Sequence, residues 1–261
     1  MLTVCLLVTG AALAQTTTPA APDRVEAAWD GTYRRIRAPI LMYHYVSDLP
    51  DDADEYRTDL SISPELFQAH IDALYTRGYT PVSLYDLDDA LLTGTPLPDS
   101  PVVLTFDDGY IDHYVNVLPV LNRYDFTGTF FVITGTADAG DPAHLSWAQI
   151  RQMADAGMDM ESHTKTHPDL RGRDYDFLVY QLLGSAESLQ AYIGRAPHIL
   201  AYPGGRYDDA VLSVLATLPV WRAVTTEPGV LHTTDNRLEM PRQRVHNDTG
   251  VTGLLYLLAA N

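Results

Sequence analysis

The stretch that organises this chain is Pro101-Val102-Val103-Leu104-Thr105-Phe106-Asp107-Asp108-Gly109-Tyr110. Its apolar, β-branched first half predicts a buried strand over residues 102–106. Two adjacent carboxylates, Asp107 and Asp108, follow where that strand ends. Successive strand side chains point to opposite faces, so one carboxylate can face a central site while the next turns elsewhere. A metal would make both tolerable, because one carboxylate can bind it and the other can act on a water. Alternatively, Asp-Asp-Gly is a simple turn, since Asp and Gly are common turn residues.

Around this stretch, the chain alternates between short apolar segments and amphipathic ones. Further strands are predicted over residues 40–46, 128–133, 158–162, 199–202, 222–225 and 238–245. Helices are predicted over residues 64–77, 113–122, 146–156, 174–193, 208–217 and 249–258, and residues 47–63 are predicted as a loop. This alternation indicates an α/β fold with a mainly parallel sheet, and about seven strands suit a closed barrel better than an open sheet. We therefore expect a single domain over residues 35–261, with its chemistry at the C-terminal ends of the strands.

The N-terminal part of the chain suggests export. Residues 1–14 form an apolar run that ends in Ala12-Leu13-Ala14, which fits a secretory signal peptide with a small-residue cleavage site. The run is too short to span a membrane, and no other stretch is long enough, so we expect no transmembrane segment. Residues 15–34 are predicted as a linker or N-terminal extension. These features predict a secreted, periplasmic or cell-envelope protein.

Charge and cysteine content exclude several classes of function. The formal net charge is -17, which argues against nucleic acid as a partner, because binding phosphates needs basic patches. The one cysteine, Cys5, lies inside the predicted signal peptide, so the mature chain would have neither disulfides nor a thiol nucleophile. The sequence does not fix an oligomeric state.

A second informative stretch covers residues 158–167 and contains His163 and His167, separated by three residues, after a predicted strand. Imidazole nitrogen suits a borderline divalent cation such as zinc. A histidine pair at this spacing also occurs by chance, so its weight comes from the combination with Asp107 and Asp108. Two histidines and one aspartate provide three protein ligands and leave positions open for water, as a catalytic metal requires.

In combination, these segments resemble the polysaccharide deacetylases of carbohydrate esterase family 4. The resemblance covers roughly residues 38–246 and rests on the T-F-D-D-G segment at 105–109, the H-T-x-x-H segment at 163–167 and the Ala-Tyr-Pro-Gly-Gly segment at 201–205. It implies a deformed (β/α)7 barrel in which Asp107 is the general base and Asp108, His163 and His167 bind a divalent metal. Zinc is favoured, with cobalt or nickel as substitutes.

The resemblance also implies the reaction, a metal-dependent removal of N-acetyl groups from a polysaccharide. The first choice of substrate is a cell-wall or biofilm glycan that contains N-acetylglucosamine. One alternative is an O-acetyl esterase that acts on acetylated xylan or another polysaccharide, since the same groups cleave esters. Another alternative, from a different class, is an inactive glycan-binding module.

The general acid is open between two histidines. Many family members take it from a C-terminal Leu-x-His segment, and Leu231-His232 lacks that spacing. His44 lies in an early Tyr-His segment that resembles the poly-N-acetylglucosamine deacetylase subgroup, in which the first strand supplies the acid. His246, at the end of the last predicted strand, is the alternative, because closing a barrel brings its first and last strands together. We favour His44.

The family's usual arginine in the third segment, which orients the base, is absent, and Ala201 stands near that place. Arg242 or Arg244 could replace it from the last strand and keep Asp107 ionised, and Arg242 is preferred.

Four residues are candidates for substrate binding. Tyr110 and Tyr202 could each offer a ring face to a sugar, although Tyr202 fits the packing of a barrel rim equally well. Pro203 and Gly204 would allow the backbone to approach a ligand closely.

Overall fold

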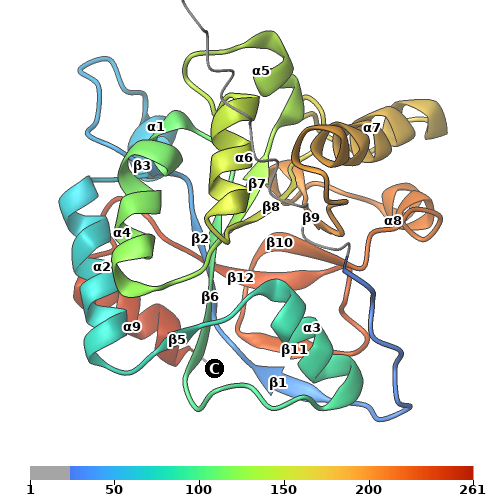
Figure 1. The fold of residues 1–261 in the computed structure, drawn as a ribbon, viewed down its shortest axis with the longest axis horizontal. Coiled ribbons are helices and arrows are strands. Elements are labelled where there is room, and N and C mark those ends of the chain that lie inside the picture. Colours follow the sequence, from blue (N-terminus) through green and yellow to red (C-terminus); the bar gives the residue numbers. More distant parts are fainter. Residues whose placement is uncertain (1–23, 261) are drawn as a thin grey trace, which may run out of the picture.

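Seven parallel strands form a closed ring at the centre of the computed structural model, which describes residues 24–260 (Figure 1). The ring runs β2-β12-β10-β9-β8-β7-β6, and β6 pairs again with β2. Its strands are β2 (Ile40–Tyr43), β6 (Pro101–Phe106), β7 (Thr129–Val132), β8 (Asp159–Ser162), β9 (Ile199–Ala201), β10 (Arg222–Pro228) and β12 (Met240–Arg244). The register between β10 and β12 shifts between Val224 and Pro228, so the barrel is irregular there. The predicted deformed (β/α)7 barrel is confirmed.

Six helices lie close to their predicted positions and surround the strands. They are α2 (Pro64–Thr76), α4 (Leu118–Tyr124), α6 (Trp147–Asp155), α7 (Tyr175–Ile193), α8 (Asp209–Leu215) and α9 (Val251–Ala259). Helices α2, α4 and α9 gather on one side of the strands, and α7 and α8 on the other (Figure 1). The segment predicted as a helix from residue 113 begins as a π-helix, η1 (His113–Val117), before α4.

The structure also contains elements that we did not predict. These are α1 (Glu55–Asp59), α3 (Leu84–Thr93), α5 (Thr134–Ala139), η2 (Pro203–Gly205), β1 (Arg35–Arg37), β4 (Ser61–Ile62), β5 (Thr80–Pro81) and β11 (Leu231–Thr233). The prediction of a loop over residues 47–63 is therefore wrong where α1 and β4 form. The single strand predicted over residues 40–46 is present but interrupted at His44, which separates β2 from β3 (Tyr45–Val46).

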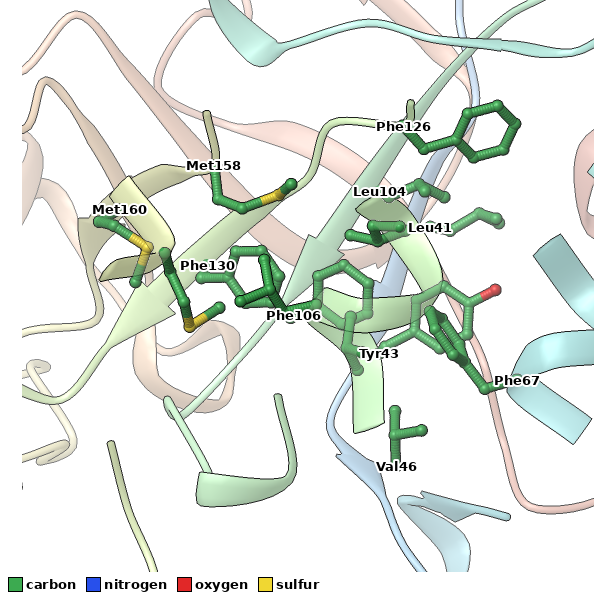
Figure 2. Close-up of a cluster of buried hydrophobic side chains, with 14 of the residues drawn as sticks. Leu41, Tyr43, Val46, Phe67, Leu104, Phe106, Phe126, Phe130, Met158 and Met160 are labelled. Carbon is green, nitrogen blue, oxygen red and sulfur yellow. The ribbon is translucent and has the colours of Figure 1, made fainter. Parts of the chain in front are cut away.

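Two hydrophobic layers follow from the alternation of side chains along the strands. The outer layer lies between the barrel and the helices, where Tyr43, Phe106 and Phe130 from three neighbouring strands stack in a row (Figure 2). The inner layer fills the barrel with side chains such as Val103 and Phe131. Leucines of α3 belong to this inner cluster, so α3 covers the end of the barrel at which the strands begin.

The segment before β1 contacts the same end of the barrel. The Arg24 guanidinium donates to Asp159 Oδ1 (3.0 Å) and lies over the Tyr85 ring, 4.0 Å from its centroid. The Asp30 N–H donates to the Leu92 carbonyl (3.1 Å). Residues 24–34, which we expected to be part of a linker, are thus attached to α3 and β8. The predicted signal peptide, residues 1–14, lies outside the described residues.

No helix within residues 24–260 is both long enough and apolar enough to cross a bilayer.

Candidate metal centre and active site

The two carboxylates diverge because the backbone turns sharply after β6. Asp107 continues the strand, and its N–H donates to the Tyr43 carbonyl on β2 (3.0 Å). Asp108 has a φ of 74° and Gly109 a φ of 71°, so both lie in the left-handed region. Such a conformation is uncommon for a residue with a side chain, and it turns Asp108 toward β8 while Asp107 faces the barrel axis.

Asp108 meets the two histidines that follow β8. Its Oδ1 lies 3.3 Å from His163 Nε2 and 3.4 Å from His167 Nε2, and the three ligand atoms all lie within 4.8 Å of one another. The Nδ1–H of His163 donates to the Ala201 carbonyl (2.8 Å). This bond orients the His163 ring with Nε2 toward Asp108, where Nε2 can donate a proton to the carboxylate in the metal-free protein or offer a lone pair to a cation. One carboxylate oxygen and two imidazole nitrogens that converge in this way fit a divalent cation.

Asp107 is held by a buried arginine from β12. Arg242 donates from Nη1 to Asp107 Oδ1 and from Nη2 to Asp107 Oδ2, each at 2.7 Å. The same guanidinium donates to the Thr105 hydroxyl (3.1 Å) and, through Nε, to the Thr225 carbonyl (2.8 Å). Arg242 is fully buried and Asp107 is 2 % exposed, so this two-point ion pair is shielded from water.

Electrostatics keeps both carboxylates ionised. Burial opposes ionisation of Asp107, but the charge of Arg242 and its hydrogen bonds outweigh it and lower the pKa of Asp107 to about 2. Burial likewise opposes ionisation of Asp108, and the hydrogen bond and charge of His163 lower its pKa below the usual range. Two ionised carboxylates thus lie side by side in the site, as a metal ligand beside a general base would require.

The two candidates for the general acid lie in different surroundings. His44 is buried, and its Nε2 lies 4.0 Å from Asp107 Oδ2. Burial lowers the pKa of His44 to about 4, against the opposite effect of both aspartates. His246 Nδ1 lies 2.9 Å from Asp59 Oδ1, in a pair whose side chains are both more than 40 % exposed.

The four candidate substrate residues differ in exposure: Tyr110 and Gly204 are accessible, whereas Tyr202 and Pro203 are buried. Tyr110 is half-buried, and its ring stacks on Tyr45 with 3.6 Å between the ring centroids. Tyr202 is fully buried, and its hydroxyl donates to the Leu238 carbonyl (2.9 Å), so its ring packs in the rim of the barrel instead of facing a sugar. Pro203 is buried and Gly204 is exposed, with a φ of 58°.

A cavity of about 550 Å³ opens beside the candidate metal ligands, and Asp108 and His167 form part of its wall. Sequence reasoning missed three of its lining residues. Tyr56 lies on α1, in the segment expected to be a loop, and His144 pairs with Asp141 (Nδ1 to Oδ2, 3.0 Å). None of these three residues, Tyr56, Asp141 and His144, belongs to a motif, so only the fold could bring them to the cavity.

Comparisons with known proteins agree with this fold. A family model described as "Polysaccharide deacetylase" matches residues 94–221. YxkH of Bacillus subtilis, whose name assigns it provisionally to the polysaccharide deacetylases, is 30% identical over 219 residues, which cover 84% of this chain and 75% of YxkH. The chain therefore belongs to the polysaccharide deacetylase family.

The chain is also similar to a solved deacetylase structure and to a second bacterial deacetylase. The structure of the Streptococcus pyogenes deacetylase PplD in complex with acetate superposes with a TM-score of 0.80 at 30% identity, covering 86% of this chain and 99% of PplD. The poly-β-1,6-N-acetyl-D-glucosamine N-deacetylase of Escherichia coli strain K12 is 29% identical over 131 residues, which is 45% of this chain but 19% of that larger protein.

Proposed function

We propose that the protein removes N-acetyl groups from a polysaccharide that contains N-acetylglucosamine, in the cell wall or in a biofilm, with zinc as the favoured metal. One observation carries the proposal: Asp108, His163 and His167 converge beside an aspartate that Arg242 holds ionised. The similarity to the poly-β-1,6-N-acetyl-D-glucosamine N-deacetylase of Escherichia coli supports the same substrate class. The apolar run at residues 1–14 supports a location in the envelope or outside the cell.

The reaction divides between the metal ligands and Asp107. A divalent cation held by Asp108, His163 and His167 would polarise the acetyl carbonyl and lower the pKa of a water. Asp107 accepts a proton from the water as its oxygen attacks the carbonyl carbon. Arg242 fixes the orientation of Asp107 and keeps it ionised until that step. The Tyr110 backbone N–H is the candidate donor to the developing oxyanion.

The carbon–nitrogen bond then breaks, and the leaving nitrogen needs a proton. We assign this step to His44, whose Nε2 lies 4.0 Å from Asp107 Oδ2. At that distance the proton that Asp107 took from water can reach His44 after a small movement and pass to the nitrogen. Water therefore supplies its hydroxyl group to the acetate and its proton to the amine. The side chain of His246 is instead exposed and paired with Asp59, so His44 is the better candidate for the general acid.

The substrate would lie in the cavity beside Asp108. Tyr110 borders this cavity with a ring that Tyr45 already supports on one face, which suits contact with a sugar ring. Exposed Gly204 would allow the backbone to approach the glycan, with Pro203 fixing the turn.

Acetate release distinguishes this proposal from its two alternatives. Initial rates should be measured on N-acetylglucosamine oligosaccharides and on acetylated xylan, after chelation and after addition of zinc, cobalt or nickel. We expect release from the N-acetylated glycan that chelation abolishes and metal restores. Faster release from xylan would instead identify an O-acetyl esterase. Glycan binding without release from either substrate, at saturating metal, would identify an inactive binding module.

A further inference from the structure

His167 is the metal ligand that the surrounding structure fixes least directly. Its side chain is 37% exposed, against 1% for His163, whose ring is already fixed by the Ala201 carbonyl. His167 has a φ of 55°, and its N–H donates to the Thr164 hydroxyl (3.1 Å). The position of its imidazole therefore depends on the conformation of the loop between the two histidines.

One residue of α7, Gln181, forms hydrogen bonds with the two residues just before His167. Gln181 Oε1 accepts from the Thr166 N–H (2.9 Å), and Gln181 Nε2 donates to the Thr166 hydroxyl (2.8 Å). The backbone carbonyl of Gln181 also accepts from the Lys165 N–H (3.0 Å). A single helical residue thus makes three hydrogen bonds to the loop.

Helix α5 holds the loop from the opposite side. The Gly135 N–H donates to the Lys165 carbonyl (2.7 Å). A Cβ at Gly135 would lie 2.4 Å from that oxygen, so only glycine allows the contact. The Lys165 ammonium donates to Asp138 (2.6 Å) and Ser188 (2.7 Å), which directs its charge away from the metal ligands. The loop is therefore clamped between α5 and α7.

Burial of the Gln181 side-chain amide is unfavourable unless it is compensated by hydrogen bonds to the loop. Gln181 is 2 % exposed and lies on the buried face of α7 beside Leu178 and Leu182. A buried amide is unfavourable unless its polar atoms are paired. Both ends of the Gln181 side chain are paired with Thr166, so any other conformation of the loop would leave a buried amide unsatisfied.

We propose that Gln181 is a positioning residue that sets the affinity of the metal centre by holding the loop before His167. This inference rests on the proposed function, because it presupposes that Asp108, His163 and His167 bind a cation. Groups that orient metal ligands typically change metal affinity by about 10- to 100-fold when they are removed.

The test uses Gln181→Met, which keeps the length of the side chain and removes its hydrogen bonds. Zinc affinity of the metal-free protein should be measured by competition with a chromophoric chelator, together with kcat and KM across zinc concentrations. We expect zinc to bind about 10- to 100-fold more weakly, kcat at limiting zinc to fall, and most of kcat to return at saturating zinc with KM unchanged. The matched control is Gln190→Met, on the exposed face of the same helix.

Zinc affinity of Gln181→Met within twofold of the native value, in a folded protein, would overturn the proposal. If Gln181→Met does not fold, Thr166→Ala decides, because it removes the acceptor of Gln181 Nε2 without altering α7. We expect a threefold to tenfold loss of affinity, about the effect of one hydrogen bond, and an unchanged affinity would again overturn the proposal. Native protein that binds zinc no better than His163→Ala would instead refute the metal centre itself.

Discussion

Replacing Arg242 with methionine should leave a buried, unpaired carboxylate in the centre of the barrel. Methionine preserves much of the apolar stem but removes every donor that reaches Asp107. Removing one partner of a buried ion pair typically destabilises a protein by about 3–5 kcal/mol, because the remaining charge keeps its desolvation cost without compensation. Arg242 is fully buried and also donates to Thr105 and Thr225, so we expect the upper part of that range at pH 7.

The pH dependence of this loss identifies its cause. In the native protein the pKa of Asp107 is lowered from 3.8 to about 2, so the pair contributes stability above pH 3.8 that is lost as the pH falls through 2. Without Arg242, burial raises the pKa of Asp107 above 3.8. The deficit of Arg242→Met should therefore shrink by about 1.4 kcal/mol for each pH unit below that raised pKa, as the orphaned carboxylate takes up a proton.

Urea unfolding of metal-free protein between pH 8 and pH 4 measures this deficit without interference from metal release. Arg244→Met is the matched control, because Arg244 lies two residues along β12 and is only half-buried. Its deficit should stay below about 1 kcal/mol at every pH.

In the metal-loaded enzyme, Arg242→Met should also lose about 100-fold in kcat, because the base is no longer oriented. A pH-independent deficit, or one as small as that of Arg244→Met, would refute the assignment. If Arg242→Met is unfolded at pH 7, Arg242→Lys, which keeps the charge but not the two-point geometry, should show the same loss of kcat.

Three further outcomes follow from the site and the barrel. Asp107→Asn should lower turnover at least about 1000-fold while equilibrium dialysis finds metal bound as in native protein, and loss of the metal would mean that the roles of the two aspartates are exchanged. His44→Ala should slow amide hydrolysis by about 10²- to 10⁴-fold but 4-nitrophenyl acetate hydrolysis by less than about tenfold, because nitrophenolate leaves without a proton. His246→Ala should change neither rate, and equal losses on both substrates in His44→Ala would contradict the role of acid. Burial lowers the pKa of His232 to about 4, so stability present above pH 6.5 is lost as the pH falls toward 4. When the pH falls from 7 to 5, the free energy of unfolding, measured in urea, should decrease by about 2 kcal/mol less in His232→Gln than in the native protein. An equal decrease in both proteins would contradict the assignment of this pH dependence to His232.

The sequence was sufficient for the barrel and for the strand ends at which the candidate metal ligands lie, because both depend on local patterns. Helix ends at Ser63, Ser146 and Gly194 carry the capping residues that the structure uses. Helix α3 had comparable signals, since Ser83 forms a capping box with Asp86 and Gly94 ends the helix, and it was within reach of the same reasoning. Strands of two or three residues, such as β4 and β11, carry too short a pattern to be recognised.

Contacts between distant segments could not be derived in the same way. Arg242 and Arg244 lie two residues apart on β12, so both point to the same face and the sequence pattern does not distinguish them. Only the pairing of β12 with β2 and of β2 with β6 brings Arg242 to Asp107. Gln181 gives a weaker signal, as a polar residue on the apolar face of α7, but its partner Thr166 lies 15 residues earlier in a loop without a periodic pattern. Sequence spacing predicts which face a residue occupies, whereas its partner depends on how the elements pack.

The outer core and the chemistry of the barrel are coupled through the two-residue period of the strands. Tyr43 and Phe106 are direct partners in the β2–β6 register, and their rings stack in the layer beneath the helices. The next residue of each segment is His44 or Asp107, whose side chains therefore point inward and approach to 4.0 Å. A shift of β2 or β6 by one residue would bury His44 or Asp107, respectively, under the helices and move an aromatic ring into the site. The aromatic row between barrel and helices thus fixes the register on which the pairing of His44 with Asp107 depends.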